Sequence, residues 1–199
     1  MTGTLEKSQG IIVAGVGGQG AITLAQLILV AAWRCGYCCM QSEVHGMSQR
    51  GGAVNAHVVF DDEPVTSPTV MEGDTDILIG MEPLETLRYV HMVKKKGIVI
   101  SSLVPIKNIV AYPNEEEVLE ALRQVPNIAL VDTRDNAKRP SDRQAGNMTL
   151  LGLASHYMPI DAAVWSDIFR ERFASKGEKV VRMNIEAFAF GRNSRINPA

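Results

Sequence analysis

The chain has 199 residues, which is long enough to bury the core of one domain. Hydrophobic residues make up 46% of it and charged residues 21%, as in ordinary globular proteins. The formal net charge is −2, which excludes a strongly basic surface for nucleic acid or anionic membranes. Residues 1–9 lack the apolar core of a signal peptide, and the longest apolar stretch, residues 21–32, is too short to span a bilayer. We therefore expect a cytoplasmic protein without nucleic-acid or membrane partners.

Apolar runs bounded by glycines and polar residues predict alternating strands and helices in the first two thirds of the chain. The predicted strands are residues 10–14, 37–43, 53–60, 76–80, 98–103 and 128–132. The predicted helices are residues 21–34, 83–93 and 115–125. Residues 94–97, Lys-Lys-Lys-Gly, are expected to end the second helix, because cations stabilise a helix C-terminus.

The pattern changes after residue 132. Residues 134–145 are polar and predict a loop or an irregular helix. Three further helices are predicted without a strand between them, over residues 147–157, 161–173 and 181–190, and Asn147 is the expected N-cap of the first. We predict a single domain over residues 1–199 of the α/β class. It is Rossmann-like, with a mainly parallel sheet flanked by helices and a helical C-terminal part.

Residues 15–20 read GVGGQG, directly after the first predicted strand and before the first predicted helix. Gly15, Gly17 and Gly20 have the spacing of the dinucleotide fingerprint, and Glu43 lies close to where such a site holds the ribose. The same loop suits other anions, because glycines let the backbone approach a phosphate at a helix N-terminus. A tight turn without a ligand is the third alternative. No Gly-Lys-Ser/Thr follows, which excludes a Walker A loop.

Residues 42–52 read SEVHGMSQRGG, where a simple dinucleotide-binding half would enter a crossover helix. Three glycines disfavour that helix. Arg50 is suited to hold a phosphate or carboxylate with its fork of donors, or to form a surface ion pair. His45 is either a ligand contact or a structural histidine. The segment predicts a site or an interface.

The three cysteines, Cys35, Cys38 and Cys39, are close together in the sequence. Their odd number argues against a disulfide framework, and zinc and iron–sulfur sites usually need four ligands. We expect reduced thiols without a catalytic role and no metal bound by this chain. A metal site shared with another chain is the alternative.

The combination of GVGGQG with EVHGMSQRGG resembles the gamma subunits and gamma domains of 2-oxoacid:ferredoxin oxidoreductases, and above all the small beta subunits of the indolepyruvate branch. Further matching segments are GMEPLETLRY, NMTLLG and NIEAFAFGR, at residues 80–89, 147–152 and 184–192. Residues 45–49, which precede Arg50, favour the indolepyruvate or arylpyruvate branch. Ser48 departs from the alanine that is frequent there.

The resemblance implies a subunit of a complex that converts a 2-oxoacid and coenzyme A to an acyl-CoA and carbon dioxide and reduces ferredoxin. Thiamine diphosphate, magnesium and [4Fe-4S] clusters are expected in a large partner subunit, and no cofactor is expected on this chain alone. The isolated chain is expected to expose an apolar patch that a homodimer could cover. Pyruvate, 2-oxoglutarate and branched-chain 2-oxoacids are the alternative substrates. A free-standing NAD(P)- or FAD-binding protein and an assembly scaffold are the alternatives of another class.

No catalytic residue follows from the sequence. The candidate site is the glycine loop with the Arg-Gly-Gly segment, which either receives the coenzyme A phosphates or faces the partner. Its residues are Gly15, Gly17, Gly18, Gln19, Gly20, Glu43, His45, Gly46, Gln49, Arg50, Gly51 and Gly52.

Overall fold

A computed structural model describes residues 8–46, 51–107, 109, 111–134 and 143–194. At its centre is a six-stranded sheet with the order β2-β3-β1-β4-β5-β6. The strands are β1 (Gln9–Val16), β2 (Cys38–His45), β3 (Ala53–Asp61), β4 (Thr75–Gly80), β5 (Val93–Ser102) and β6 (Ile128–Val131). The predicted class, an α/β fold with a mainly parallel sheet, is confirmed.

One strand, β3, runs against all the others. The pairs β1–β4, β4–β5 and β5–β6 are parallel, whereas β3 is antiparallel to both of its neighbours, β1 and β2. Because β3 lies between them, β2 is separated from β1 by about 10 Å, twice the usual strand spacing. An apolar run in the sequence predicts a strand but not its direction. The position of β3 between β1 and β2 was therefore not predicted.

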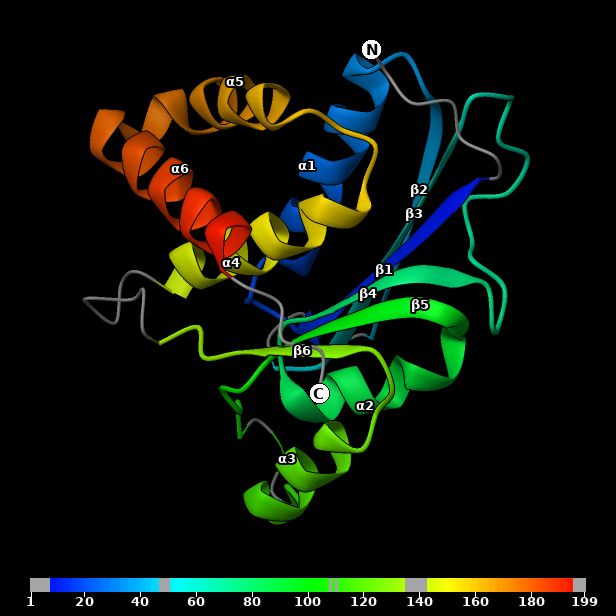
Figure 1. Ribbon diagram of the computed structural model, residues 1–199. Helices are drawn as coiled ribbons and strands as arrows, with labels where there is room; N and C mark the ends of the chain where they lie inside the picture. The colour runs from blue at the N-terminus through cyan, green and yellow to red at the C-terminus, as the bar shows by residue number, and fades with distance from the viewer. Residues whose placement is uncertain (1–7, 47–50, 108, 110, 135–142, 195–199) are drawn as a thin grey trace.

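Helices cover both faces of the sheet (Figure 1). One face carries α1 (Ala21–Arg34), α4 (Arg143–Ala154), α5 (Ala162–Phe173) and α6 (Glu178–Asn193), and the other carries α2 (Pro83–Tyr89) and α3 (Glu115–Arg123). Short 3-10 turns follow three of the helices: η1 (Val90–Met92), η3 (Ser155–Tyr157) and η4 (Ala174–Lys176). Alternate residues of β1 enter the two cores, Ile11 and Val13 on the first face and Ile12 and Ala14 on the second. Within the described ranges, no helix is both long and apolar enough to cross a bilayer.

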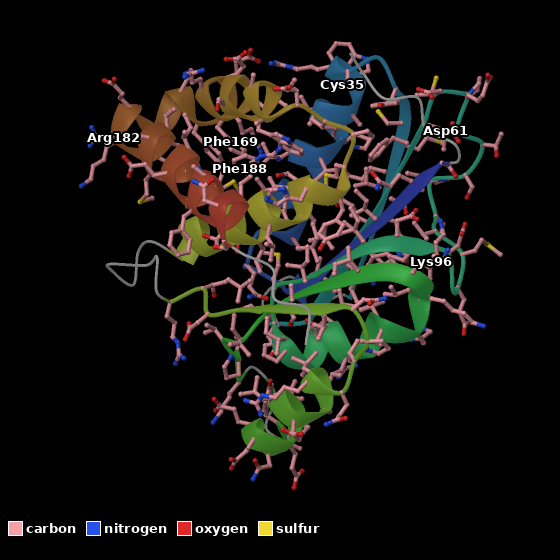
Figure 2. The ribbon with its side chains drawn as sticks, in the orientation of Figure 1. Cys35, Asp61, Lys96, Phe169, Arg182 and Phe188 are labelled. Carbon is pink, nitrogen blue, oxygen red and sulfur yellow. The ribbon has the colours of Figure 1, made fainter. Side chains whose placement is uncertain are left out.

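Aromatic side chains join α5 to α6 in the larger core. The ring centroid of Phe169 lies 5.2 Å from that of Phe188, and the ring of Trp165 lies 5.6 Å from Phe188. Figure 2 shows Phe169 and Phe188 where the two helices meet. All three side chains are almost fully buried. Because such rings each bury a large apolar area, they fix the position of the C-terminal helices.

Two glycines allow α4 and α6 to cross at close range. A Cβ atom on Gly152 would lie 2.1 Å from the Phe188 carbonyl oxygen, and one on Gly191 would lie 2.0 Å from the Thr149 carbonyl oxygen. No side chain fits at either position. This crossing sets the position of α4, which reaches the glycine loop with its first turns.

The prediction that residues 94–97 end a helix is wrong. The helix ends at Tyr89, and the lysines belong to β5. The Lys94 ammonium lies 2.8 Å from the Asp76 carboxylate and 3.1 Å from that of Asp74. These contacts hold Lys94 beside β4, and a Cβ on Gly97 would lie 2.7 Å from the Thr75 carbonyl oxygen, which requires glycine there.

The prediction that Asn147 is an N-cap is also wrong. Helix α4 begins at Arg143, so Asn147 lies inside it. Its side-chain amide donates to the Gln19 carbonyl oxygen at 2.6 Å. A polar residue before an apolar run suggested a cap, but its partner belongs to a loop 128 residues away.

Gly191→Ala is expected to lower the free energy of unfolding by about 2–3 kcal/mol, because the added methyl group forces α4 and α6 apart. Chemical denaturation followed by circular dichroism measures this change. Glu186→Ala, an exposed position on the same helix, is the control and should cost less than about 0.5 kcal/mol. Equal stability of the two variants would contradict the close crossing.

Candidate functional site

The candidate site lies at the carboxyl edge of the sheet, between β1 and β4. These strands are parallel neighbours, but β1 leads into α1 on one face and β4 leads into α2 on the other (Figure 1). Such a change of direction leaves a crevice in which open α/β sheets bind ligands. The GVGGQG segment forms the β1 side of this point, and Met81 with Glu82 forms the β4 side.

The glycine loop has a backbone that glycine alone adopts easily. Gly18 and Gly20 have φ values of +98° and +94°, in the left-handed region. Gly20 is the N-cap of α1. It has no side chain that could accept a hydrogen bond from the backbone amides of the first turn, and this turn contains no acidic residue. The 14-residue helix therefore presents N–H groups and the positive end of its dipole without a capping group of its own.

Gln19 holds the loop in place. Its side-chain oxygen accepts a hydrogen bond from the Val16 amide at 2.6 Å, and its side-chain nitrogen donates to the Met81 carbonyl oxygen at 2.9 Å. The backbone oxygen of Gln19 accepts from Asn147. One residue thus connects β1, the end of β4 and α4.

The structure brings part of the Arg-Gly-Gly segment to this loop. The Gly17 amide donates to the Gly52 carbonyl oxygen at 2.7 Å, and the Gly51 amide donates to the Gly17 carbonyl oxygen at 3.2 Å. Gly15, at the end of β1, pairs with Val54. The other two members of the predicted site in this segment, Gln49 and Arg50, lie outside the described residues.

Glu43 and His45 lie on β2 and are farther from the glycine loop, and Gly46 directly follows that strand. Glu43 pairs with Ala56 and His45 with Val54 on β3, so a whole strand separates both from β1. The Glu43 carboxylate is exposed and accepts from Gln41 at 2.9 Å. A dinucleotide site needs its ribose-binding acid on the strand next to the glycine loop. Glu43 is therefore not on the strand next to β1, where an acid that binds the ribose would lie.

Glu82 is a buried residue at this carboxyl edge of the sheet. No motif in the sequence indicated it as a member of the site. It is 1% exposed and caps α2, since its carboxylate accepts from the Glu85 amide at 2.8 Å. The same carboxylate accepts from the Tyr112 hydroxyl, and burial together with this bond raises the pKa of Tyr112. An acid directly before Pro83 was the available signal, because proline favours the first position of a helix.

Glu85 is a second buried carboxyl group below this edge. It is 4% exposed, and one of its oxygens has no partner in the part of the chain that the structure describes. Burial raises the pKa of Glu85, while Arg88, whose Nε lies 3.4 Å away, lowers it. The protonated form is therefore favoured more than in an exposed glutamate.

The cysteines lie at the other end of α1 from the glycine loop, as the position of Cys35 shows (Figure 2). Cys38 is exposed, and burial raises the pKa of Cys35 and of Cys39. Among the residues with described positions, no group of three His, Cys, Asp or Glu side chains could hold a metal ion.

Comparison with known proteins gives matches over nearly the whole chain. A family model described as pyruvate ferredoxin/flavodoxin oxidoreductase matches residues 10–194. Indolepyruvate oxidoreductase subunit IorB of Archaeoglobus fulgidus is 35% identical over 196 residues, covering 94% of this chain and 95% of that protein. The pyruvate/ketoisovalerate oxidoreductases common subunit gamma of Thermococcus kodakarensis is 29% identical, covering 87% of this chain and 92% of that protein. These matches confirm the family to which the sequence was compared above.

Solved structures share the fold at low identity. A chain of 2-oxoglutarate:ferredoxin oxidoreductase from Magnetococcus marinus, solved with 2-oxoglutarate, coenzyme A and succinyl-CoA bound, has a TM-score of 0.73 and 21% identity, and the match covers 94% of this chain and 31% of that chain. The gamma subunit of a keto/oxoacid ferredoxin oxidoreductase from Geobacter sulfurreducens has a TM-score of 0.65 and 20% identity, with 92% and 95% covered. The matched fold is thus a part of one longer chain and almost all of a separate subunit.

Gln19→Leu is expected to lower the free energy of unfolding by about 2 kcal/mol, because it leaves the Val16 amide and the Met81 carbonyl group without partners. Hydrogen exchange of the Val16 amide should become faster at the same time. Gln26→Leu on the exposed side of α1 is the control. Unchanged exchange at Val16 in Gln19→Leu would show that this side chain does not hold the loop.

Glu85→Gln is expected to gain stability relative to the native chain as the pH rises. The pKa of Glu85 is raised in the folded chain, mainly by burial. Its contribution to the free energy of unfolding is therefore full at acidic pH and is lost as the pH rises above the ordinary glutamate pKa. The amide does not titrate, so the difference in unfolding free energy should be small at acidic pH and grow towards neutrality. Denaturation at several pH values measures it, with exposed Glu186→Gln as the control. A difference independent of pH would contradict the raised pKa.

Proposed function

The chain belongs to the pyruvate ferredoxin/flavodoxin oxidoreductase family, and we propose that it is the small subunit of an indolepyruvate-type 2-oxoacid:ferredoxin oxidoreductase. It is thus an oxidoreductase subunit. The observation that carries the indolepyruvate assignment is the 35% identity to the Archaeoglobus IorB subunit over 94% of the chain. The gamma subunit that serves pyruvate and ketoisovalerate enzymes is less similar, at 29% identity.

In this function the complex converts a 2-oxoacid and coenzyme A to an acyl-CoA and carbon dioxide and passes two electrons to ferredoxin. A large partner subunit holds thiamine diphosphate, magnesium and [4Fe-4S] clusters, which supply the carbanion and electron-transfer chemistry when bound. This chain contributes binding and orientation. Its own fold offers a phosphate-accepting helix N-terminus at the switch point of the sheet.

The glycine loop and the Arg-Gly-Gly segment receive the phosphates of coenzyme A in this proposal. Two features support that role. The first turn of α1 has uncapped N–H groups beside Gly18 and Gly20, and Gly51 and Gly52 are hydrogen-bonded to Gly17. Arg50 precedes Gly51 directly in the sequence, and an arginine carries a fork of donors suited to phosphate. A loop that only packs against the partner subunit is the competing role.

Co-purification with the large subunit tests the function itself. The two chains are expressed together, and reduction of a viologen dye is measured with an arylpyruvate and coenzyme A, with and without this chain. We expect activity that needs both chains and is higher with an arylpyruvate than with pyruvate or 2-oxoglutarate. Failure to associate, together with tight NAD(P)H or flavin binding by this chain alone, would overturn the proposal.

Arg50→Ala tests the role of the segment in the assembled complex. Loss of a charge-assisted bidentate contact is worth about 1.5–3 kcal/mol, so the KM for coenzyme A should rise by about 10-fold or more. The KM for the 2-oxoacid should change little. Arg123→Ala, an exposed position on α3, is the control. An unchanged KM for coenzyme A with normal assembly would refute the phosphate-binding role and leave the oxidoreductase function intact.

A further inference from the structure

One edge of the sheet is formed by β2, and among the described residues this strand has a neighbouring strand, β3, on one side only. Its eight residues, Cys38–His45, pair with β3 over their whole length without a register shift. The strand at the opposite edge, β6, has only four residues. A long and regular edge strand offers a row of backbone N–H and C=O groups to another strand.

The sequence of β2 lacks the residues that usually keep an exposed edge from pairing. Natural edge strands are commonly protected by proline, by lysine, by a bulge or by a very short length. The sequence of β2, CCMQSEVH, contains no proline and no lysine, and its single acid is Glu43. Both the length and the composition of this strand therefore favour pairing with another strand.

Exposed apolar side chains lie along this edge. Met40 and Val44 are on the same face of β2, because alternate residues of a strand point the same way, and Val44 is 58% exposed. On the other face, the Cys39 thiol donates to the Leu29 carbonyl oxygen of α1 at 3.6 Å. Trp33, one helical turn after Leu29, is 69% exposed. The apolar surface at this edge thus extends from the strand to α1.

Strand β2 is complementary to a second copy of itself in one antiparallel register. Residues directly opposite each other in an antiparallel pair share a face, so a two-fold axis perpendicular to the sheet passes through a residue and not between two. With the axis at Ser42, Met40 lies opposite Val44 of the second copy. Gln41 then lies opposite Glu43 of the second copy, so apolar pairs form on one face and amide–carboxylate pairs on the other.

The two neighbouring registers are less favourable. An axis at Glu43 places this carboxylate opposite its own copy, and like charges directly opposite destabilise a pair of strands. An axis at Gln41 places Met40 opposite Ser42, so the two exposed apolar side chains no longer meet. The register with the axis at Ser42 is the one that matches both apolar and polar groups.

We propose that two copies of this chain associate through β2, with the two-fold axis at Ser42, and form one continuous sheet. Both copies of α1 then lie on the same face of that sheet, because the axis is perpendicular to it. The exposed Trp33 side chains cover the junction on this face, and Met40 and Val44 cover it on the other. The inference does not depend on the proposed function.

Sedimentation equilibrium of the full-length chain under reducing conditions tests the association. The native chain is expected to be a dimer, and the reducing agent excludes a dimer linked through the exposed Cys38 thiol. Met40→Lys should raise the Kd of the dimer about 10-fold or more, because an ammonium group replaces an apolar contact at two symmetric positions. Phe190→Lys, at an exposed apolar position on α6, is the control and should leave the Kd unchanged.

A pair of opposite charges tests the register. Met40→Lys/Val44→Glu places opposite charges across the junction if residue 40 lies opposite residue 44 of the second copy, so this variant should recover most of the affinity lost in Met40→Lys. The two positions are about 13 Å apart within one strand, so the charges do not pair in a single copy. Met40→Lys/Val44→Lys is the matched control and should associate less than Met40→Lys. Circular dichroism checks that each variant is folded.

The outcomes decide between a second copy and other occupants of this edge. A native chain that stays monomeric at every concentration would overturn the proposal, and so would a dimer that Met40→Lys leaves unchanged. Equal affinities of the two double variants would contradict the register. If the native chain is a monomer and Met40→Lys prevents binding to the large subunit, the edge pairs with that subunit and the proposal is wrong. The oxidoreductase function is tested separately, by co-purification with the large subunit.

Discussion

The two hydrogen bonds of the Gln19 side chain hold together the edge on which the candidate site depends. One amide group accepts from Val16 at the end of β1 and donates to Met81 at the end of β4, so the two strands that diverge at the switch point are joined at their carboxyl ends. Glycines on either side allow the backbone to turn, with Gly18 and Gly20 in the left-handed region. The first turn of α1 then starts at a fixed place. Any anion at that turn meets a loop that is already ordered by bonds within the chain.

The antiparallel strand β3 is what separates this fold from a nucleotide-binding half. In such a half the second strand lies beside the first, and an acid at its end reaches the ribose. Here β3 occupies that place, and its amino end brings Gly51 and Gly52 to Gly17 instead. The glycine loop therefore lies beside Gly51 and Gly52 and not beside the strand that would carry a ribose-binding acid. This surface combines a helix N-terminus with a glycine-rich segment, and the coenzyme A phosphate site that we propose is built on it.

The sequence allowed the glycine loop and the Arg-Gly-Gly segment to be singled out, because glycines at special backbone positions and an arginine beside them form a local pattern. It gave no indication that Arg172, Lys176 and Asn184 lie near this loop. Arg172 belongs to α5, Lys176 to η4 and Asn184 to α6. Their positions depend on how α5 and α6 pack through Phe169 and Phe188. It also misplaced Asn147, since a local rule for helix caps has no knowledge of a partner 128 residues earlier.

The sequence by itself determined the α/β class, most of the strands and helices, the strand–loop–helix at residues 15–20 and the family resemblance, because apolar periodicity and short motifs are local. Only the tertiary structure decided the strand order, the reversed direction of β3 and the strand that begins at Val93. It also decided which distant side chains lie near Gly18. These features depend on hydrogen bonds and packing between segments far apart in the chain, for which one sequence carries no local signal.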